Sequence, residues 1–293
     1  ELPSYVGAIS AIRNVGESMV GVRQETDGID VDHLGHTIVR LRAEGGRVKM
    51  LYVVPNFQNP TGLLLSLPKR LALLEWADRH DVLIVEDDPY RDIYFPDVST
   101  EADTRPIAAD DRSGRVVYLS SFSKTLAPGF RVGWASAPPA VAAKLELSKQ
   151  AEDLCTGGLD QRVVFEACRR GLLESHVPQL RAHYQQKRDT MVSAIAREMP
   201  DQVKWIAPRG GFFLWVALTH GLTSAEVMPV AQARGVIFVD GHAFFVDGSG
   251  TEFMRLSFSA PSPARIDEGI ARLASAIKEA ASRRATSETA ALR

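Results

Sequence analysis

The chain has 293 residues, of which 45% are apolar and 24% are charged, and its 34 Lys and Arg nearly balance its 36 Asp and Glu. This composition is ordinary for a globular protein, and the chain is long enough for one or two domains with full cores. The net charge is −2 and the basic residues form no runs, so the sequence offers no positively charged surface for a polyanion. Nucleic acid is therefore not an expected partner. The longest apolar runs are shorter than the ~18 residues of a membrane span, so a membrane partner is not expected either.

Cysteine and histidine usage argues against cross-links and metal sites. Cys155 and Cys168 are the only cysteines, which disfavours a disulfide framework and indicates a reducing cytoplasm. The seven histidines form no His-x-x-x-His pair, so no metal site is expected. His33 and His36 lie three apart, and we interpret them as two surface histidines on one helix.

A buried strand and a helix open the first half of the chain. Val48–Pro55 is a nearly continuous β-branched apolar run, which predicts a buried strand. Ser66 then precedes a pattern with a period of 3.6 residues, which predicts a helix capped by Ser66 and extending to about His80. The apolar positions expected to share one face of this helix are Leu67, Leu71, Leu74 and Ala77.

Three further strands follow in the same half. They are predicted over Val82–Val85, Val116–Leu119 and Arg131–Ala137. Strands without alternation, separated by helical patterns, are typical of an α/β fold with a mostly parallel sheet that is covered on both faces.

The second half predicts a smaller α+β domain. Helical patterns dominate from Ala140 to about Met199, and three strand-like runs with one helix between them and another after them follow at Gly210–Val216, Val236–Val239 and Phe253–Phe258. We therefore expect a large domain over residues 1–175 and a small domain over residues 176–281. Residues 282–293 lose the apolar period and are expected to form a frayed tail.

Polar residues gather just past the ends of the predicted strands. They are Asn59, Asp87, Tyr90, Ser121, Ser123 and Lys124. Each alone has an ordinary explanation as a turn residue, a solvated carboxylate or a surface charge. Together, and with Arg131 seven residues after Lys124, they favour a ligand site at the edge where open α/β sheets bind ligands.

The chemistry of this set indicates one cofactor. Hydroxyls and an arginine suit a phosphate, a lysine in an apolar setting can act as a Schiff-base amine, and a carboxylate can pair with a protonated pyridine nitrogen. These three features together predict pyridoxal 5′-phosphate (PLP), with no metal.

Five motifs along the chain resemble those of one family. Ser121–Trp134 (SFSKTLAPGFRVGW) resembles the PLP-lysine motif of fold-type I, class I/II aminotransferases. Asn59–Gly62 and Glu86–Tyr90 match two further signatures, and Pro208–Trp215 and Met254–Ser259 match those of the small domain. The combination most resembles the kynurenine/2-aminoadipate aminotransferase branch, which also includes the aminotransferase domains fused to GntR-type regulators. The resemblance implies a PLP-dependent transferase-like large domain, a small C-terminal α+β domain and a homodimer.

The resemblance implies three catalytic residues. Lys124 resembles the lysine that holds PLP as a Schiff base and then moves the substrate proton. Asp87 resembles the partner of the pyridine nitrogen, and it is preferred to Asp88 because Tyr90 lies three residues after it. Tyr90 and Asn59 resemble the donors to the phenolic oxygen of the cofactor, and Asn59 is also expected beside the substrate.

The same resemblance implies the remaining contacts. Ser121, Ser123 and Arg131 resemble the phosphate ligands. Tyr5 resembles the aromatic residue that stacks on the cofactor, with an ordinary packed tyrosine as the alternative. Arg255 resembles the arginine that binds the substrate α-carboxylate, with a salt bridge to a neighbouring acid as the alternative.

The resemblance begins abruptly at Glu1, and nothing here matches the N-terminal segment of the family. That segment caps the phosphate and supplies much of the specificity pocket, so the sequence identifies the chemistry better than the substrate. Two explanations are open: the residues are the retained part of a longer enzyme, or the chain is a true fragment. We favour the first, because the remaining motifs are chemically intact.

The sequence thus predicts a cytoplasmic, homodimeric aminotransferase of amino-acid metabolism that exchanges an amino group between an L-amino acid and a 2-oxo acid. A PLP-dependent lyase, oxidase or cyclase on the same scaffold is an alternative, because a fold does not fix a reaction. Another alternative is the PLP-binding sensor domain of a GntR-type transcription regulator. An upstream winged helix-turn-helix would identify that case, and it alone would make nucleic acid a partner.

Overall fold

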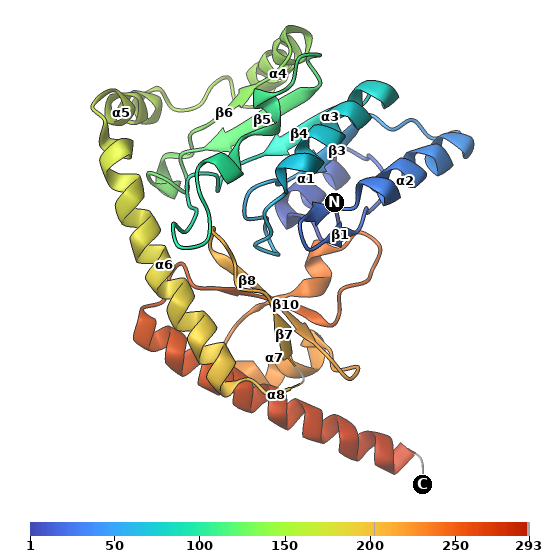
Figure 1. Cartoon of the computed structure of the whole chain (residues 1–293), viewed down its shortest axis with the longest axis vertical. Helices are drawn as coiled ribbons and strands as arrows, with labels where there is room; N and C mark the ends of the chain where they lie inside the picture. Colours follow the sequence, from blue (N-terminus) through green and yellow to red (C-terminus); the bar gives the residue numbers. More distant parts are fainter. Residues whose placement is uncertain (202, 292–293) are drawn as a thin grey trace.

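The computed structural model describes residues 1–201 and 203–291, which form two four-stranded sheets connected by long helices (Figure 1). The first sheet has the order β3-β4-β5-β6, with β3 at Met50–Val53, β4 at Leu83–Asp87, β5 at Val116–Ser121 and β6 at Gly133–Ser136. β3, β4 and β5 are parallel, and β6 pairs antiparallel with β5. The predicted α/β fold with a mostly parallel sheet is therefore confirmed.

The helices α2 (Val31–Ala43) and α3 (Leu67–His80) pack on this sheet. Their buried Ile38, Leu73 and Trp76 join Ile84 of β4 in one apolar cluster. Before them lie α1 (Val6–Asn14) and a short hairpin of β1 (Gln24–Glu25) and β2 (Gly28–Ile29). α2 carries His33 and His36, as expected.

The helix predicted from Ser66 to His80 is confirmed with Ser66 at its N-cap position, but only half of its predicted apolar face faces the core. Leu67 and Leu71 are 40% and 51% exposed, whereas Ala77 is buried and Leu74 packs against the core. The Ser66 hydroxyl makes no cap bond to the helix and instead donates to Asp27 Oδ2 at 2.9 Å.

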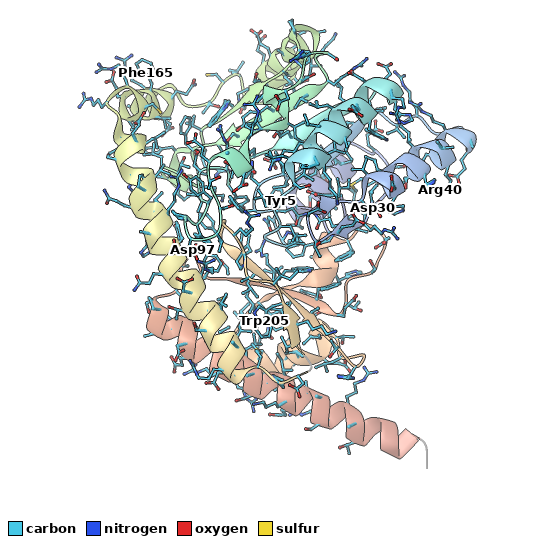
Figure 2. All side chains as sticks on the ribbon, in the orientation of Figure 1. Tyr5, Asp30, Arg40, Asp97, Phe165 and Trp205 are labelled. Atoms are coloured by element: carbon cyan, nitrogen blue, oxygen red, sulfur yellow. The ribbon has the colours of Figure 1, made fainter. Side chains whose placement is uncertain are left out.

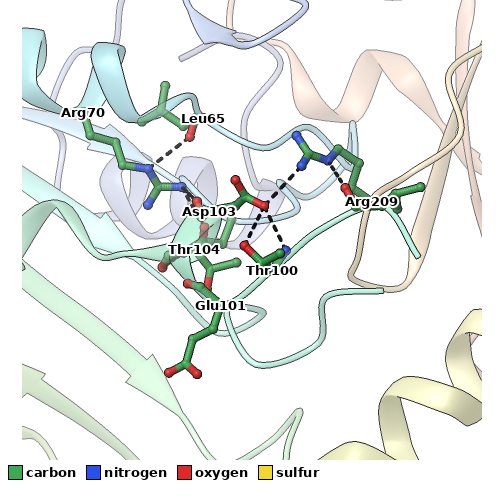
Figure 3. A network of polar contacts seen from close by, with 9 residues as sticks. Leu65, Arg70, Thr100, Glu101, Asp103, Thr104 and Arg209 are labelled. Carbon is green, nitrogen blue, oxygen red and sulfur yellow. Dashed lines mark hydrogen bonds and ion pairs between the residues drawn. The ribbon is translucent and has the colours of Figure 1, made fainter. Parts of the chain in front are cut away.

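Arg70 of α3 is buried because backbone carbonyls satisfy its guanidinium. It donates to the carbonyls of Leu65 at 3.0 Å and Arg105 at 2.6 Å, and to Asn56 Oδ1 at 2.7 Å. Figure 3 shows this arginine beside the loop that follows β4, where Asp103 accepts from Thr100 and Arg209. These bonds hold the turn after β3 against the loop after β4.

The middle of the chain is helical, as predicted, with α4 at Pro139–Glu152, α5 at Gly158–Arg169 and α6 at Leu172–Glu198. α6 runs as one long rod from α5 down to the second sheet (Figure 1). The proposed domain division at residue 175 falls inside this helix, and the division stays a prediction.

The second sheet is antiparallel and has the order β7-β8-β10-β9. Its strands are β7 (Val203–Trp205), β8 (Phe213–Leu218), β9 (Val239–Asp240) and β10 (Phe253–Ser257). Residues of α6, α7 (Ser224–Ala233) and α8 (Pro263–Ala291) form one apolar core with the sheet. β7 was not predicted.

The frayed tail predicted over residues 282–293 is wrong as far as Ala291, because α8 continues to that residue. The segment contains neither Gly nor Pro, and ion pairs tie Arg283 to Glu279 and Arg284 to Glu226. Residues 292–293 lie outside the described residues. Within the described ranges, no helix is both long and apolar enough to span a bilayer.

Candidate functional site

The candidate site lies where the parallel strands of the first sheet end. Asp87 is the last residue of β4, Ser121 is the last residue of β5, and Lys124 follows three residues later. Because parallel strands present their carboxyl ends at one edge, these residues converge. Arg255 comes from β10 of the second sheet, so the site spans both sheets.

Arg255 connects the two sheets through a polar contact. Its Nη1 donates to Asn59 Oδ1 at 2.7 Å, and its guanidinium lies 4.1 Å from the ring centroid of Phe213. Its Nε is buried without a partner, and no acid of the described residues forms an ion pair with it. Burial lowers the pKa of this guanidinium. The arrangement leaves a desolvated cation with free donors, which suits a carboxylate ligand better than the salt bridge that was the alternative.

Lys124 has an amine with no hydrogen bond or ion pair to any described residue, and its Nζ lies 6.0 Å from the ring centroid of Tyr90. Burial, then the charges of Arg131 and Arg255, lower the pKa of this amine, and Asp87 opposes them. A lowered pKa increases the neutral fraction of the amine, which is the form that acts as a nucleophile or base.

Asp87 faces Lys124 and is held by a residue that sequence reasoning missed. Tyr52 of β3 donates its hydroxyl to Asp87 Oδ2 at 2.5 Å. Burial raises the pKa of the Asp87 carboxyl, while the Tyr52 hydrogen bond and the Lys124 charge lower it. Tyr52 lies inside the apolar run that predicted β3, so the sequence offered no reason to interpret it as anything but a core residue. Only the alternation of side chains along β3 could have indicated which face of the sheet its hydroxyl takes.

Asp88, the acid that was not preferred, points elsewhere. It accepts from Asn56 Nδ2 at 2.8 Å and from the Tyr118 hydroxyl at 3.2 Å. Burial raises its pKa to about 7. The geometry therefore agrees with the choice of Asp87 over Asp88 as the acid beside Lys124.

The raised pKa of Asp88 predicts a pH-dependent stability. A carboxyl whose pKa is higher in the folded state stabilises the fold only while protonated, so its contribution falls as the pH rises from about 4 to about 7. Asp88→Asn should remove this component, which is at most about 4 kcal/mol at about 1.4 kcal/mol per pKa unit. Urea unfolding at pH 5 and pH 8 measures it, with the exposed Asp32→Asn as control. A variant whose pH dependence parallels that of the wild type would contradict this assignment.

Tyr90 and Asn59 lie together beside Arg255. Tyr90 is buried against the edges of Phe212 and Phe213, and Asn59 forms a hydrogen bond with its phenol. Burial raises the pKa of Tyr90 well above its usual value, so its phenol stays protonated and can donate.

The structure brings two of the three expected phosphate ligands into contact. Ser121 Oγ donates to Ser123 Oγ at 2.8 Å and accepts from the Ser123 N–H at 3.0 Å. Arg131 has a left-handed backbone (φ 53°), is exposed, and donates to the Pro128 carbonyl at 3.2 Å. It makes no bond to either serine, although its charge acts on Lys124.

Tyr5 belongs to the same region. It is 38% exposed, and Figure 2 shows it between the two sheets. Its phenol interacts electrostatically with Tyr90 and Arg255. This proximity to Tyr90 and Arg255 favours a place at the site over an ordinary packed tyrosine. Among the described residues, no group of three or more His, Cys, Asp or Glu could hold a metal ion.

Comparisons with known proteins cover nearly the whole chain. The family model for aminotransferase class I and II matches residues 2–273. Aromatic-amino-acid aminotransferase 1 of Thermococcus litoralis is 40% identical over 279 residues, which are 95% of this chain and 66% of that protein. The chain thus spans about two thirds of the length of this relative.

A solved structure and a regulator are also similar. The crystal structure of Pyrococcus horikoshii kynurenine aminotransferase in complex with PMP, KYN as substrates and KYA as products superposes with a TM-score of 0.90 at 39% identity, covering 94% of this chain and 68% of that one. The uncharacterized HTH-type transcriptional regulator YdfD of Bacillus subtilis is 31% identical over 281 residues, which are 96% of this chain and 56% of the regulator.

Proposed function

Because the chain belongs to the class I and II aminotransferase family, we propose that the protein transfers an amino group between an L-amino acid and a 2-oxo acid with PLP as its cofactor. The resemblance found in the sequence is confirmed. The observation that carries the proposal is the meeting of three groups where the strand ends of the first sheet face the second sheet: the Lys124 amine, which has no partner among the described residues, the Asp87 carboxylate and the desolvated Arg255 guanidinium.

The residues present fit the cofactor. Tyr52 donates to one carboxylate oxygen of Asp87, and no described residue forms a hydrogen bond with the other oxygen. A protonated ring nitrogen can pair with that second oxygen. The unpartnered amine of Lys124 can carry the aldehyde carbon, and Tyr90 with Asn59 can donate to the phenolic oxygen. Ser121, Ser123 and Arg131 supply donors for the phosphate, and Tyr5 supplies a face for the ring.

When bound, PLP supplies an electron sink that stabilises negative charge at the substrate Cα. The chain supplies the rest of the chemistry. Arg255 binds the substrate α-carboxylate and so fixes which Cα bond faces Lys124. Lys124 would take the Cα proton and deliver it to the former aldehyde carbon of the cofactor, because its lowered pKa increases the fraction of amine that can accept a proton. Asp87 keeps the ring nitrogen positive.

A stoichiometric assay tests this function. We would load the protein with PLP, add single L-amino acids without an acceptor, and measure the 2-oxo acid released per site. Amino transfer predicts one equivalent and no ammonia, and the reactive amino acid names the donor. Release of ammonia with continuing turnover would support a lyase or an oxidase instead.

Effector sensing in a transcription regulator is a second candidate function, because the match to YdfD covers 96% of this chain. A sensor domain requires binding of an amino acid without sustained turnover. If the protein binds an amino acid but releases less than one equivalent of 2-oxo acid with any donor, the sensor function is favoured.

A homodimer in the cytoplasm is part of the proposal. Large apolar side chains are exposed on β6, α4, α5 and the turn between these helices, including Trp134, Leu147, Leu154 and Leu159, and exposed large apolar side chains are enriched at protein interfaces. Both cysteines are free thiols, which suits a reducing compartment. Light scattering at micromolar concentration tests the dimer, and a monomeric mass would contradict it.

Asp87→Asn should retain the cofactor and lose most of its turnover. The amide keeps the shape of the side chain but removes the charge that holds the ring nitrogen protonated, and loss of a charge-stabilising contact of this kind costs about 10²- to 10³-fold in kcat. Stopped-flow assay at saturating donor measures kcat, and Asp32→Asn is the surface control. Turnover near that of the wild type would remove this role from Asp87.

A further inference from the structure

Tyr52 and Asp87 form a pair across neighbouring strands. β3 and β4 are parallel, and Tyr52 lies opposite Val85, two residues before Asp87. From this position the phenol reaches the Asp87 carboxylate, with its hydroxyl 2.5 Å from Oδ2. This is the only hydrogen bond to the side chain of Asp87 within residues 1–201 and 203–291, so one donor sets the orientation of this carboxylate.

The phenol is a constant donor. Burial and the negative charge of Asp87 keep the pKa of Tyr52 well above its usual value. Glu1 and Tyr5 are the other titratable groups that face it, and the negative charge that either carries when ionised acts in the same direction. Tyr52 therefore stays protonated at every pH at which the protein would work, and its hydroxyl always donates to Oδ2.

We propose that Tyr52 is a positioning residue that holds the Asp87 carboxylate so that Oδ1 faces the ring nitrogen of the cofactor. This inference rests on the proposed function. A hydrogen bond to one oxygen of a carboxylate makes the carboxylate less basic. The proton shared between Asp87 and the ring nitrogen then stays on the nitrogen, where the positive charge is useful to the reaction.

The chain contains a matched control for this contact. Tyr118 of β5 donates to Asp88 Oδ2 at 3.2 Å, so it is the same residue type bonded to the adjacent carboxylate. Tyr118→Phe and Tyr52→Phe each remove one hydroxyl oxygen and keep the ring. Only the second should affect the acid that faces Lys124.

The first experiment needs no turnover. With ¹³C-labelled aspartate, NMR titration of the cofactor-free protein reports the pKa of Asp87, assigned by loss of its signal in Asp87→Asn. Tyr52→Phe should raise this pKa, and Tyr118→Phe should leave it unchanged. An Asp87 pKa that is equal in the wild type and Tyr52→Phe would overturn the proposal, even if the protein proves not to be an aminotransferase.

The second experiment uses the protein loaded with ¹⁵N-labelled PLP. The ring nitrogen should resonate as a protonated pyridine in the wild type and in Tyr118→Phe, and should move toward the neutral position in Tyr52→Phe. A wild-type nitrogen that is already neutral would count against the proposed role of Asp87 and, with it, against this inference. A protonated nitrogen in both the wild type and Tyr52→Phe would count against the role of Tyr52 alone.

Kinetics supply the third test. Tyr52→Phe should lower kcat by about 10- to 100-fold, the expected cost of one hydrogen bond to a charged group, with little change in KM. In an Asp87→Asn background the same substitution should have no further effect, because Tyr52 acts through Asp87. Additive losses, or a Tyr52→Phe protein that fails to fold or to bind PLP, would instead assign Tyr52 a general structural role.

Discussion

Replacing Lys124 by alanine is expected to lower the rate of amino transfer by about 10²- to 10⁴-fold, the usual contribution of a positioned acid or base. The half-buried amine has no partner among the described residues, and burial and two arginine charges lower its pKa. Release of 2-oxo acid in a single turnover measures the rate. Lys144→Ala is the control, because Lys144 is an exposed lysine of α4.

A second substitution separates charge from proton transfer. Lys124→Arg keeps a positive charge at the site, but a guanidinium does not give up its proton in proteins. We expect this variant to be as slow as Lys124→Ala. If arginine restored most of the rate, Lys124 would act by its charge and the proton-transfer role would be lost.

Replacing Arg255 by lysine should lower kcat/KM for amino acids by about 10²-fold, because an ammonium cannot form a bidentate pair with a carboxylate and leaves a buried acceptor poorly satisfied. Most of the loss should be in KM. Initial rates over a range of donor concentrations measure both constants. Arg181→Lys is the matched control, since Arg181 also lies over an aromatic ring, that of Tyr94 at 3.7 Å, outside the site.

A donor without a carboxylate sharpens this test. With a simple primary amine as donor, Arg255 has no anion to bind, so the wild type and Arg255→Lys should react at similar rates. An equal loss with both donors would show that Arg255 supports the site through Asn59 and does not recognise the substrate carboxylate.

The parts of the site that the sequence could predict are those fixed by local motifs. Asp87 ends a strand and Lys124 follows the next one, so the order of the strands was enough to bring them together. Arg255 could be singled out as a charged residue within an apolar strand, yet its contact with Asn59 joins residues 196 apart in sequence. Only the packing of the second sheet against the first creates that contact.

The parts that could not be predicted depend on which face a side chain takes. In α3 the apolar period suggested that Leu67 and Leu71 are buried, but Arg70 takes a buried position because carbonyls of two loops satisfy it. Tyr52 was likewise hidden among apolar neighbours in β3. A buried polar contact between distant residues leaves no periodic signal, and such contacts decided these two cases.

The identity of the lysine that carries the cofactor tests the proposed PLP site most directly. The protein is loaded with PLP, reduced with borohydride and digested, and mass spectrometry locates the phosphopyridoxyl group. We expect the label on Lys124 alone, and no label in Lys124→Ala. A label on another lysine, or an unlabelled wild type, would contradict the assignment of Lys124 as the residue that binds PLP.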